Sequence, residues 1–264
     1  MDLHLKGKVA LVTGGSEGIG EGIVLELAKE GVSVAVCARR EEPLMKLAKK
    51  LDEIGNPYFT VSADCTSQSQ MNDVVASIAE KLGKIDILVN NAGGGASGER
   101  KIEDSDEAWL ACYDLNVWST VRTTRAVYPH MKERKSGNVI IVSSVGGHSG
   151  GMLGVADYNS AKAAQLLLTK SWAHDFAPDK VRVNAICPAF IRTPLWEKLA
   201  LAFTPGEGET TETFFEKTAK ELPVRRMGKP EDVGRVAAFL ASDFAAGFIT
   251  GGCWDVDGGF TTKI

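Results

Sequence analysis

Short apolar runs alternate with amphipathic stretches from one end of the chain to the other. The first run, Val9-Ala-Leu-Val-Thr13, is followed by a glycine turn and an amphipathic stretch over Ile19 to Glu30. Short apolar runs of this kind indicate buried strands, and apolar positions three and four apart indicate helices. We expect strands at 9–13, 32–38, 58–63, 85–89, 139–142, 181–186 and 253–256. We expect helices at 19–30, 41–54, about 68–82, about 104–135, 158–176 and 233–242.

Near-continuous apolar strands between helices are typical of a parallel sheet that is covered on both faces. Because strand-helix-strand connections wind right-handed, the pattern predicts an α/β fold with a single Rossmann-type doubly wound parallel sheet and helices on both faces. No shift in composition marks a boundary, so residues 1–264 are expected to form a single domain. An insert at about 194–223 interrupts the alternation. We expect it to form a substrate lid, and a surface loop without function is the alternative.

Composition narrows the class of partner. Hydrophobic and charged contents of 44% and 24% are globular averages, and a net charge of −4 without a basic patch argues against nucleic acid. No apolar run approaches the ~18 residues of a membrane span, and the N-terminus is too charged for a signal peptide. Five dispersed cysteines without a C-x-x-C pair suggest reduced thiols and a cytoplasmic location. No cluster has metal-ligand spacing, so no catalytic metal is expected.

A glycine-rich turn joins the first expected strand to the first expected helix. It reads Thr13-Gly14-Gly15-Ser16-Glu17-Gly18-Ile19-Gly20. Glycines at this place let the backbone turn tightly and approach a pyrophosphate, whose charge meets the helix N-terminus. The turn therefore indicates a dinucleotide site at the start of the fold.

The end of the second strand indicates which dinucleotide binds. A carboxylate there would bond the ribose of NAD, whereas arginine suits the 2′-phosphate of NADP. The chain has Ala38-Arg39-Arg40 and no carboxylate until Glu41, which favours NADP(H). NAD(H) remains possible, since Glu17 in the glycine turn could repel the extra phosphate. The missing carboxylate also weakens the case for an adenosylmethionine-dependent methyltransferase.

Tyr158 and Lys162 stand four residues apart in an expected helix, so both side chains project from one face. A free tyrosine has a pKa of about 10 and is a poor base at neutral pH. An ammonium one turn away favours the phenolate and brings the group towards the working pH of general acid-base catalysis. By itself, such a pair is more often a solvated helix face.

Further motifs resemble the short-chain dehydrogenase/reductase family along nearly the whole chain. The glycine turn matches Thr-Gly-x-x-x-Gly-x-Gly, Asn90 to Gly93 match Asn-Asn-Ala-Gly, and Val256 to Gly259 match a terminal signature. Pro188 to Thr193 resemble Pro-Gly-x-x-x-Thr, although Ala189 stands where the family has glycine. Asn116 in Leu-Asn-Val and Ser144 in Ile-Val-Ser-Ser match two further family positions.

The resemblance implies which residues act. The catalytic tetrad would be Asn116, Ser144, Tyr158 and Lys162. The stretch from Ser144 to Tyr158 is one residue longer than expected, so Ser143 is the substitute for Ser144 if the register differs. The expected cofactor-binding residues are Gly14, Ser16, Glu17, Gly18, Ile19, Gly20, Arg39, Arg40, Asp64, Cys65, Asn91, Ala92, Gly93, Tyr158, Lys162, Pro188, Ile191 and Thr193.

The resemblance also implies a mechanism and an assembly. Ser144 would orient the substrate oxygen, Tyr158 would exchange the proton, and Asn116 would support a relay water beside Lys162. The expected function is NADP(H)-dependent interconversion of a ketone or other carbonyl substrate and its secondary alcohol. The alternatives are an NAD-dependent dehydrogenase of a hydroxylated metabolite and a nucleotide-sensing protein without turnover. A homo-oligomer, tetramer or dimer, is expected, with Trp109, Trp118 and Trp172 on the helices that often form the subunit contact.

Overall fold

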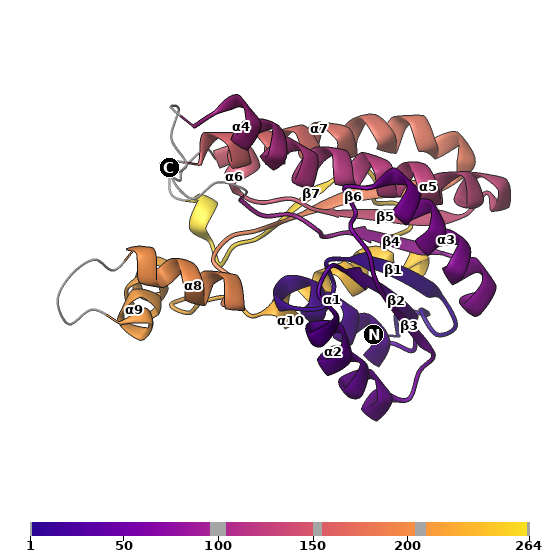
Figure 1. The fold of residues 1–264 in the computed structure, drawn as a ribbon, viewed down its shortest axis with the longest axis horizontal. Helices are drawn as coiled ribbons and strands as arrows, with labels where there is room; N and C mark the ends of the chain where they lie inside the picture. Colours follow the sequence, from indigo (N-terminus) through magenta and orange to yellow (C-terminus); the bar gives the residue numbers. More distant parts are fainter. Residues whose placement is uncertain (1, 96–103, 150–154, 204–209, 263–264) are drawn as a thin grey trace.

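Parallel strands form one twisted sheet through the centre of the computed structural model, which describes residues 2–95, 104–149, 155–203 and 210–262 (Figure 1). Within these ranges the sheet has seven strands in the order β3-β2-β1-β4-β5-β6-β7, every pair parallel. The strands are β1 (Val9–Thr13), β2 (Ser33–Ala38), β3 (Tyr58–Ser62), β4 (Ile87–Asn90), β5 (Gly137–Val142), β6 (Val181–Pro188) and β7 (Cys253–Val256). The order reverses between β1 and β4, which confirms the predicted doubly wound α/β fold.

Helices cover both faces of the sheet (Figure 1). One face carries α1 (Gly18–Lys29), α2 (Glu41–Ile54) and α10 (Pro230–Ala241). The other carries α3 (Gln68–Leu82), α4 (Asp106–Tyr113), α5 (Ser119–Arg134) and α7 (Ala156–Phe176). Shorter helices are α6 (Gly146–Ser149) and α11 (Asp243–Ala246), and η2 (Ala177–Asp179) and η3 (Phe260–Thr262) are 3₁₀ turns.

Alternation along each strand divides the core into two layers. On β1, Ala10 and Val12 pack with α1, whereas Val9 and Leu11 face the layer beneath α3 and α5. All four side chains are at most 4% exposed. Full burial of a large aliphatic side chain contributes about 1.5–3 kcal/mol, so both layers hold the sheet rigid. A rigid sheet is what fixes the loops at its carboxyl edge.

The expected helix over 104–135 proves to be three elements. A π-helical turn, η1 (Asp114–Trp118), separates α4 from α5. Its wider turn is the kind of irregularity that hydrophobic periodicity does not reveal and that is frequent at functional sites. The insert is helical as well, with α8 (Pro194–Phe203) and α9 (Thr211–Glu221), while residues 204–209 of the expected lid lie outside the described residues.

No helix among the described residues is long and apolar enough to cross a bilayer.

Candidate active site

The glycine turn lies between the carboxyl end of β1 and the N-terminus of α1. Gly18 has φ +59°, a left-handed conformation that favours glycine, and a Cβ there would lie 3.3 Å from Thr193 Cγ2. Thr193 follows β6, so the turn and the loop after β6 meet although they are distant in sequence. Glu17, the N-cap residue of α1, makes no side-chain cap, which leaves the first N–H groups of the helix for an anionic ligand.

Asn91 and Ala92, which follow β4, form hydrogen bonds with this turn. The Asn91 side chain donates to the main-chain oxygens of Thr13 and Gly14, both at 3.0 Å. The N–H of Ala92 donates to Thr13 Oγ1 at 3.1 Å. These bonds join the carboxyl ends of β1 and β4, the point at which the strand order reverses and open α/β sheets bind their ligands.

Charged residues gather where β2 and β3 end. Arg39 and Arg40 are exposed beyond β2, and Arg40 pairs with Glu17 of the glycine turn. Asp64 accepts hydrogen bonds from the N–H and hydroxyl of Thr66, at 2.9 and 2.8 Å. Burial alone would raise the pKa of Asp64, but these bonds and the charge of Arg39 outweigh it and lower the pKa. Cys65 is buried, and this burial raises its pKa to about 11, so it is a neutral thiol.

Lys162 and Tyr158 share one face of α7. Lys162 Nζ lies 5.5 Å from the centroid of the Tyr158 ring. The ammonium is 3% exposed and donates to the Val142 main-chain oxygen and to Gln165 Oε1, both at 3.0 Å. Burial lowers the pKa of Lys162 to about 8. The sequence prediction that one helix face presents both side chains together is therefore realised, with the lysine inside the protein.

Asn116 occupies the π turn and is fully buried. Its side-chain amide donates to the main-chain oxygens of Gly94 and Cys112, both at 2.8 Å, and its Oδ1 accepts from the N–H of Gly94 at 3.1 Å. The asparagine thus ties the loop after β4 to the helix that faces Lys162.

Two serines follow β5, and their hydroxyl groups make different contacts. Ser143 is buried, and its hydroxyl donates to the Lys162 main-chain oxygen at 2.9 Å. Ser144 is half-buried, and its Oγ accepts from the N–H of Gly146 at 3.1 Å. The Ser143 hydroxyl already holds α7, which favours Ser144 as the serine that meets a ligand.

The remaining expected cofactor residues line the same edge of the sheet. Ser16 is buried within the glycine turn, whose last residues, Ile19 and Gly20, belong to the first turn of α1. Pro188 ends β6, and Ile191 forms an isolated parallel bridge with Gly228. The loops at the carboxyl ends of β1, β4 and β6 therefore carry these cofactor-binding candidates.

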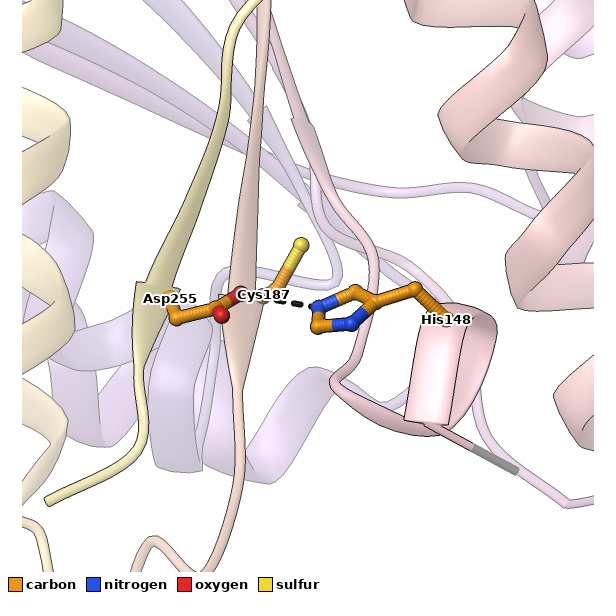
Figure 2. A group of neighbouring side chains, drawn as sticks. All are labelled: His148, Cys187 and Asp255. Atoms are coloured by element: carbon orange, nitrogen blue, oxygen red, sulfur yellow. Dashed lines mark hydrogen bonds and ion pairs between the residues drawn. The ribbon is translucent and has the colours of Figure 1, made fainter. Parts of the chain in front are cut away.

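A polar pair from two separate elements lies beside the Ser144 loop. His148 on α6 lies 2.9 Å, Nε2 to Oδ1, from Asp255 on β7, 107 positions away in sequence. Figure 2 shows both side chains converging next to Cys187 of β6. In the described part of the chain these are the residues that could jointly hold a metal ion, since their donor atoms lie within 4.8 Å of one another. The direct His–Asp contact needs no metal and anchors the loop after Ser144 to the sheet.

Aromatic rings connect the insert to the body of the protein. Phe190 packs against Trp196 of α8 and Phe260 of η3, with centroid separations of 5.3 and 5.2 Å. Trp196 also stacks near Phe214 of α9, at 6.1 Å. Arg192 forms a two-point ion pair with Glu212, with N–O distances of 3.2 and 2.9 Å. Beyond this base, α8 and α9 stand out from the carboxyl edge of the sheet (Figure 1).

Comparisons with known proteins agree with this geometry. Residues 8–202 match the family model described as short chain dehydrogenase. The chain is 40% identical to an oxidoreductase, UcpA, of Salmonella typhimurium over 97% of this chain and 95% of the relative. It is 35% identical to the 3-oxoacyl-[acyl-carrier-protein] reductase FabG of Thermotoga maritima, over 97% and 99% of the two chains.

A solved structure of L-sorbose reductase from Gluconobacter frateurii, complexed with NADPH and L-sorbose, is 34% identical and superimposes with a TM-score of 0.93 over the full length of both chains. The family match covers most of the chain, and the relatives cover nearly all of it. The chain therefore belongs to the short-chain dehydrogenase/reductase family and is an oxidoreductase that acts on alcohol and carbonyl groups with a nicotinamide cofactor.

Proposed function

We propose that the chain interconverts a ketone or other carbonyl substrate and its secondary alcohol with NADP(H), and that Tyr158 is its general acid and base. The observation that carries this proposal is the buried Lys162 ammonium 5.5 Å from the Tyr158 ring. A cation in a low-dielectric site stabilises the phenolate and lowers the pKa of the phenol. The tyrosine then exchanges a proton near neutral pH, which an isolated phenol does poorly.

The residues at the carboxyl edge fit a dinucleotide. The uncapped N-terminus of α1 would receive the pyrophosphate, and Asn91, Ala92 and Gly93 would line the adjoining ribose. At Gly93 a Cβ would fall within 3.1 Å of Lys162 Nζ, so the bare backbone leaves the lysine open to that ribose. When bound, the nicotinamide supplies a hydride to the carbonyl carbon or accepts one from the alcohol carbon.

Tyr158 and Ser144 would hold the substrate oxygen through their hydroxyl groups. In reduction Tyr158 gives its proton to this oxygen as negative charge develops there, and in oxidation the phenolate takes the alcohol proton. Lys162 keeps the phenol acidic throughout. The α8–α9 insert would cover the substrate, because Trp196 and Phe214 extend an apolar surface from Phe190 at the end of β6.

The preference for NADP(H) rests on Arg39, which is exposed at the end of β2 with no carboxylate beside it in sequence. A guanidinium offers a fork of donors to a 2′-phosphate. The NADPH-bound sorbose reductase supports the same choice. The ion pair between Arg40 and Glu17 favours the second candidate, an NAD-dependent dehydrogenase, because it engages one of the two arginines.

Assembly and compartment belong to the same proposal. We place the enzyme in the cytoplasm as a homo-oligomer, tetramer or dimer. The five cysteines, all in the described part of the chain, form no disulfide, which suits a reducing compartment. Leu110, Trp118 and Leu167 are 68%, 49% and 66% exposed on α4, η1 and α7, helices that lie together on one face of the molecule. Apolar side chains exposed on one face support a subunit contact there.

A cofactor titration and a substrate panel test the proposed function. Binding of NADPH and NADH is followed by fluorescence, and turnover of ketones and secondary alcohols by nicotinamide absorbance. We expect tighter NADPH binding and turnover that Tyr158→Phe abolishes while cofactor affinity stays. Equal or tighter NADH binding rejects the cofactor assignment. Cofactor binding without turnover of any substrate supports the nucleotide-sensing alternative.

A further inference from the structure

A third polar side chain of α7 contacts the catalytic lysine. Gln165 lies less than one turn beyond Lys162 and is completely buried. Its Oε1 accepts from Lys162 Nζ at 3.0 Å, and its Nε2 donates to the main-chain oxygen of Asn116 at 2.8 Å. The carboxamide thus spans from the ammonium to the π turn. None of the motifs identified in the sequence includes this residue.

The hydrogen-bond network permits one orientation of the amide. An ammonium has donors only, so it requires the carbonyl end of Gln165. The Thr120 hydroxyl donates to the Asn116 oxygen at 2.9 Å, and its own oxygen accepts from Gln165 Nε2 at 2.9 Å. A flipped amide would place NH₂ against the ammonium and leave the Asn116 oxygen with one donor fewer. Each group in this buried network therefore fixes the hydrogen-bond orientation of its neighbour.

The Asn116 carbonyl is fully used by these contacts. Its oxygen accepts from Gln165 Nε2 and from Thr120 Oγ1, which matches the two lone pairs of a carbonyl oxygen. The Gln165 carboxamide bridges this oxygen to the Lys162 ammonium.

We propose that Gln165 is a positioning residue for the reaction, whose carboxamide holds the Lys162 ammonium beside Tyr158. The proposal rests on the function proposed above. The carbonyl oxygen of Gln165 stabilises the charged lysine, whose burial favours the neutral amine. A carboxamide is not a ready proton carrier. The contact therefore fixes the position of the ammonium and does not carry protons to it.

Other titratable groups also face Lys162, and substitution of Gln165 leaves these residues unchanged. Cys112 approaches from α4 and Cys187 from β6, while Tyr158 lies on the same helix as Lys162. Burial raises the pKa of the Cys187 thiol, which keeps it neutral across the working range. A change at Gln165 therefore acts on the lysine and, through it, on the tyrosine.

Gln165→Leu removes the carboxamide at nearly constant volume, and Gln165→Met does so with an unbranched chain that tolerates repacking. Thr169→Val is the matched control, because the Thr169 hydroxyl donates to the Gln165 main-chain oxygen at 2.9 Å one turn further on. All three remove buried hydrogen bonds on α7, but the control leaves the lysine contact intact. Folding is checked by circular dichroism and melting, and the better folded of the two Gln165 variants is used.

The readout is the pH profile of kcat together with ultraviolet titration of the Tyr158 phenolate, taken as the difference from Tyr158→Phe. Without the carboxamide the ammonium is less stable, so the alkaline limb of the kcat profile should move about one unit to lower pH, and the phenolate should form about one unit higher. At neutral pH kcat should fall roughly tenfold.

Thr169→Val should move neither curve. Unchanged curves in a folded Gln165 variant, or equal shifts in the control, overturn the proposal. The phenolate titration needs no substrate, so it decides the role of Gln165 even if the proposed reaction itself is not found.

Discussion

Gly93 and Lys162 lie so close that no side chain fits between them. A Cβ at Gly93 would stand 3.1 Å from Lys162 Nζ and 2.7 Å from Asn116 Oδ1. The loop that follows β4 and the Lys162 side chain are therefore packed as one unit, and the position of the loop sets that of the ammonium.

Gly93→Ala should reduce kcat/KM roughly tenfold to a hundredfold, because the added methyl group displaces either Asn116 or the ammonium by a few tenths of an ångström or more. Steady-state kinetics with NADPH measures the loss. Gly137→Ala is the matched control, since its Cβ would press on the Met131 side chain far from the site, with Sδ at 2.5 Å. The control should lower the melting temperature and leave kcat/KM unchanged. Equal kinetic losses in both variants would show that overpacking alone explains the effect.

The burial of Lys162 predicts opposite pH trends for activity and stability. Burial lowers its pKa to about 8 from 10.5, so the ammonium, and with it the charge that would stabilise a Tyr158 phenolate, is lost as pH rises through about 8. The unfolded chain binds more protons at this residue between about 8 and 10.5, so its contribution to the free energy of unfolding rises with pH across that window. Lys162→Met should abolish both trends at this site.

Denaturant unfolding of the parent chain and of Lys162→Met at a series of pH values measures the stability trend. The difference between the two should change by on the order of 1–3 kcal/mol across the window, with the parent gaining relative to the variant as pH rises. A difference that is constant with pH would mean that the lysine titrates normally in the folded protein.

The limits of sequence reasoning follow from where each contact arises. The seven strands and the shared face of Tyr158 and Lys162 follow from periodicity, which acts within one element. The Gln165 bridge joins α7 to η1, and the His148–Asp255 contact joins α6 to β7. In the sequence Gln165 looks like a core position of a helix, and His148 looks like an exposed loop residue. Glu17 was weighed in sequence as a repulsive charge towards NADP(H), whereas the structure pairs it with Arg40. Such contacts depend on tertiary packing that pattern alone does not encode.

Glu17→Gln should strengthen the preference for NADPH over NADH. The change releases Arg40 from its ion pair and removes a negative charge near the expected 2′-phosphate. A hydrogen bond to a charged group contributes about 1.5–3 kcal/mol, so full engagement of Arg40 would tighten NADPH binding by roughly tenfold or more. Arg39→Ala should weaken NADPH binding by a similar factor and leave NADH unaffected.

Glu21→Gln is the control for this pair of variants, because Glu21 also lies on α1 and pairs with Lys50 of α2 at 2.5 Å. Fluorescence titration of both cofactors with all three variants gives the ratios. If Arg39→Ala weakens NADH and NADPH alike, the arginine contacts the ribose and the NAD-dependent alternative gains.

The exposed apolar face of α4, η1 and α7 should be a subunit contact. Trp118→Asp and Leu167→Asp place charges on this face, where Trp118 is 49% and Leu167 66% exposed. A buried carboxylate without a partner disfavours association strongly, so each variant should lower the assembly state while keeping the fold. Sedimentation velocity measures the state, and Met45→Asp on α2, where the side chain is 60% exposed, is the control. Because α7 also carries Tyr158 and Lys162, loss of the contact should reduce kcat as well, through a less firmly held helix. A chain that sediments as a monomer before any substitution contradicts the assignment of this face.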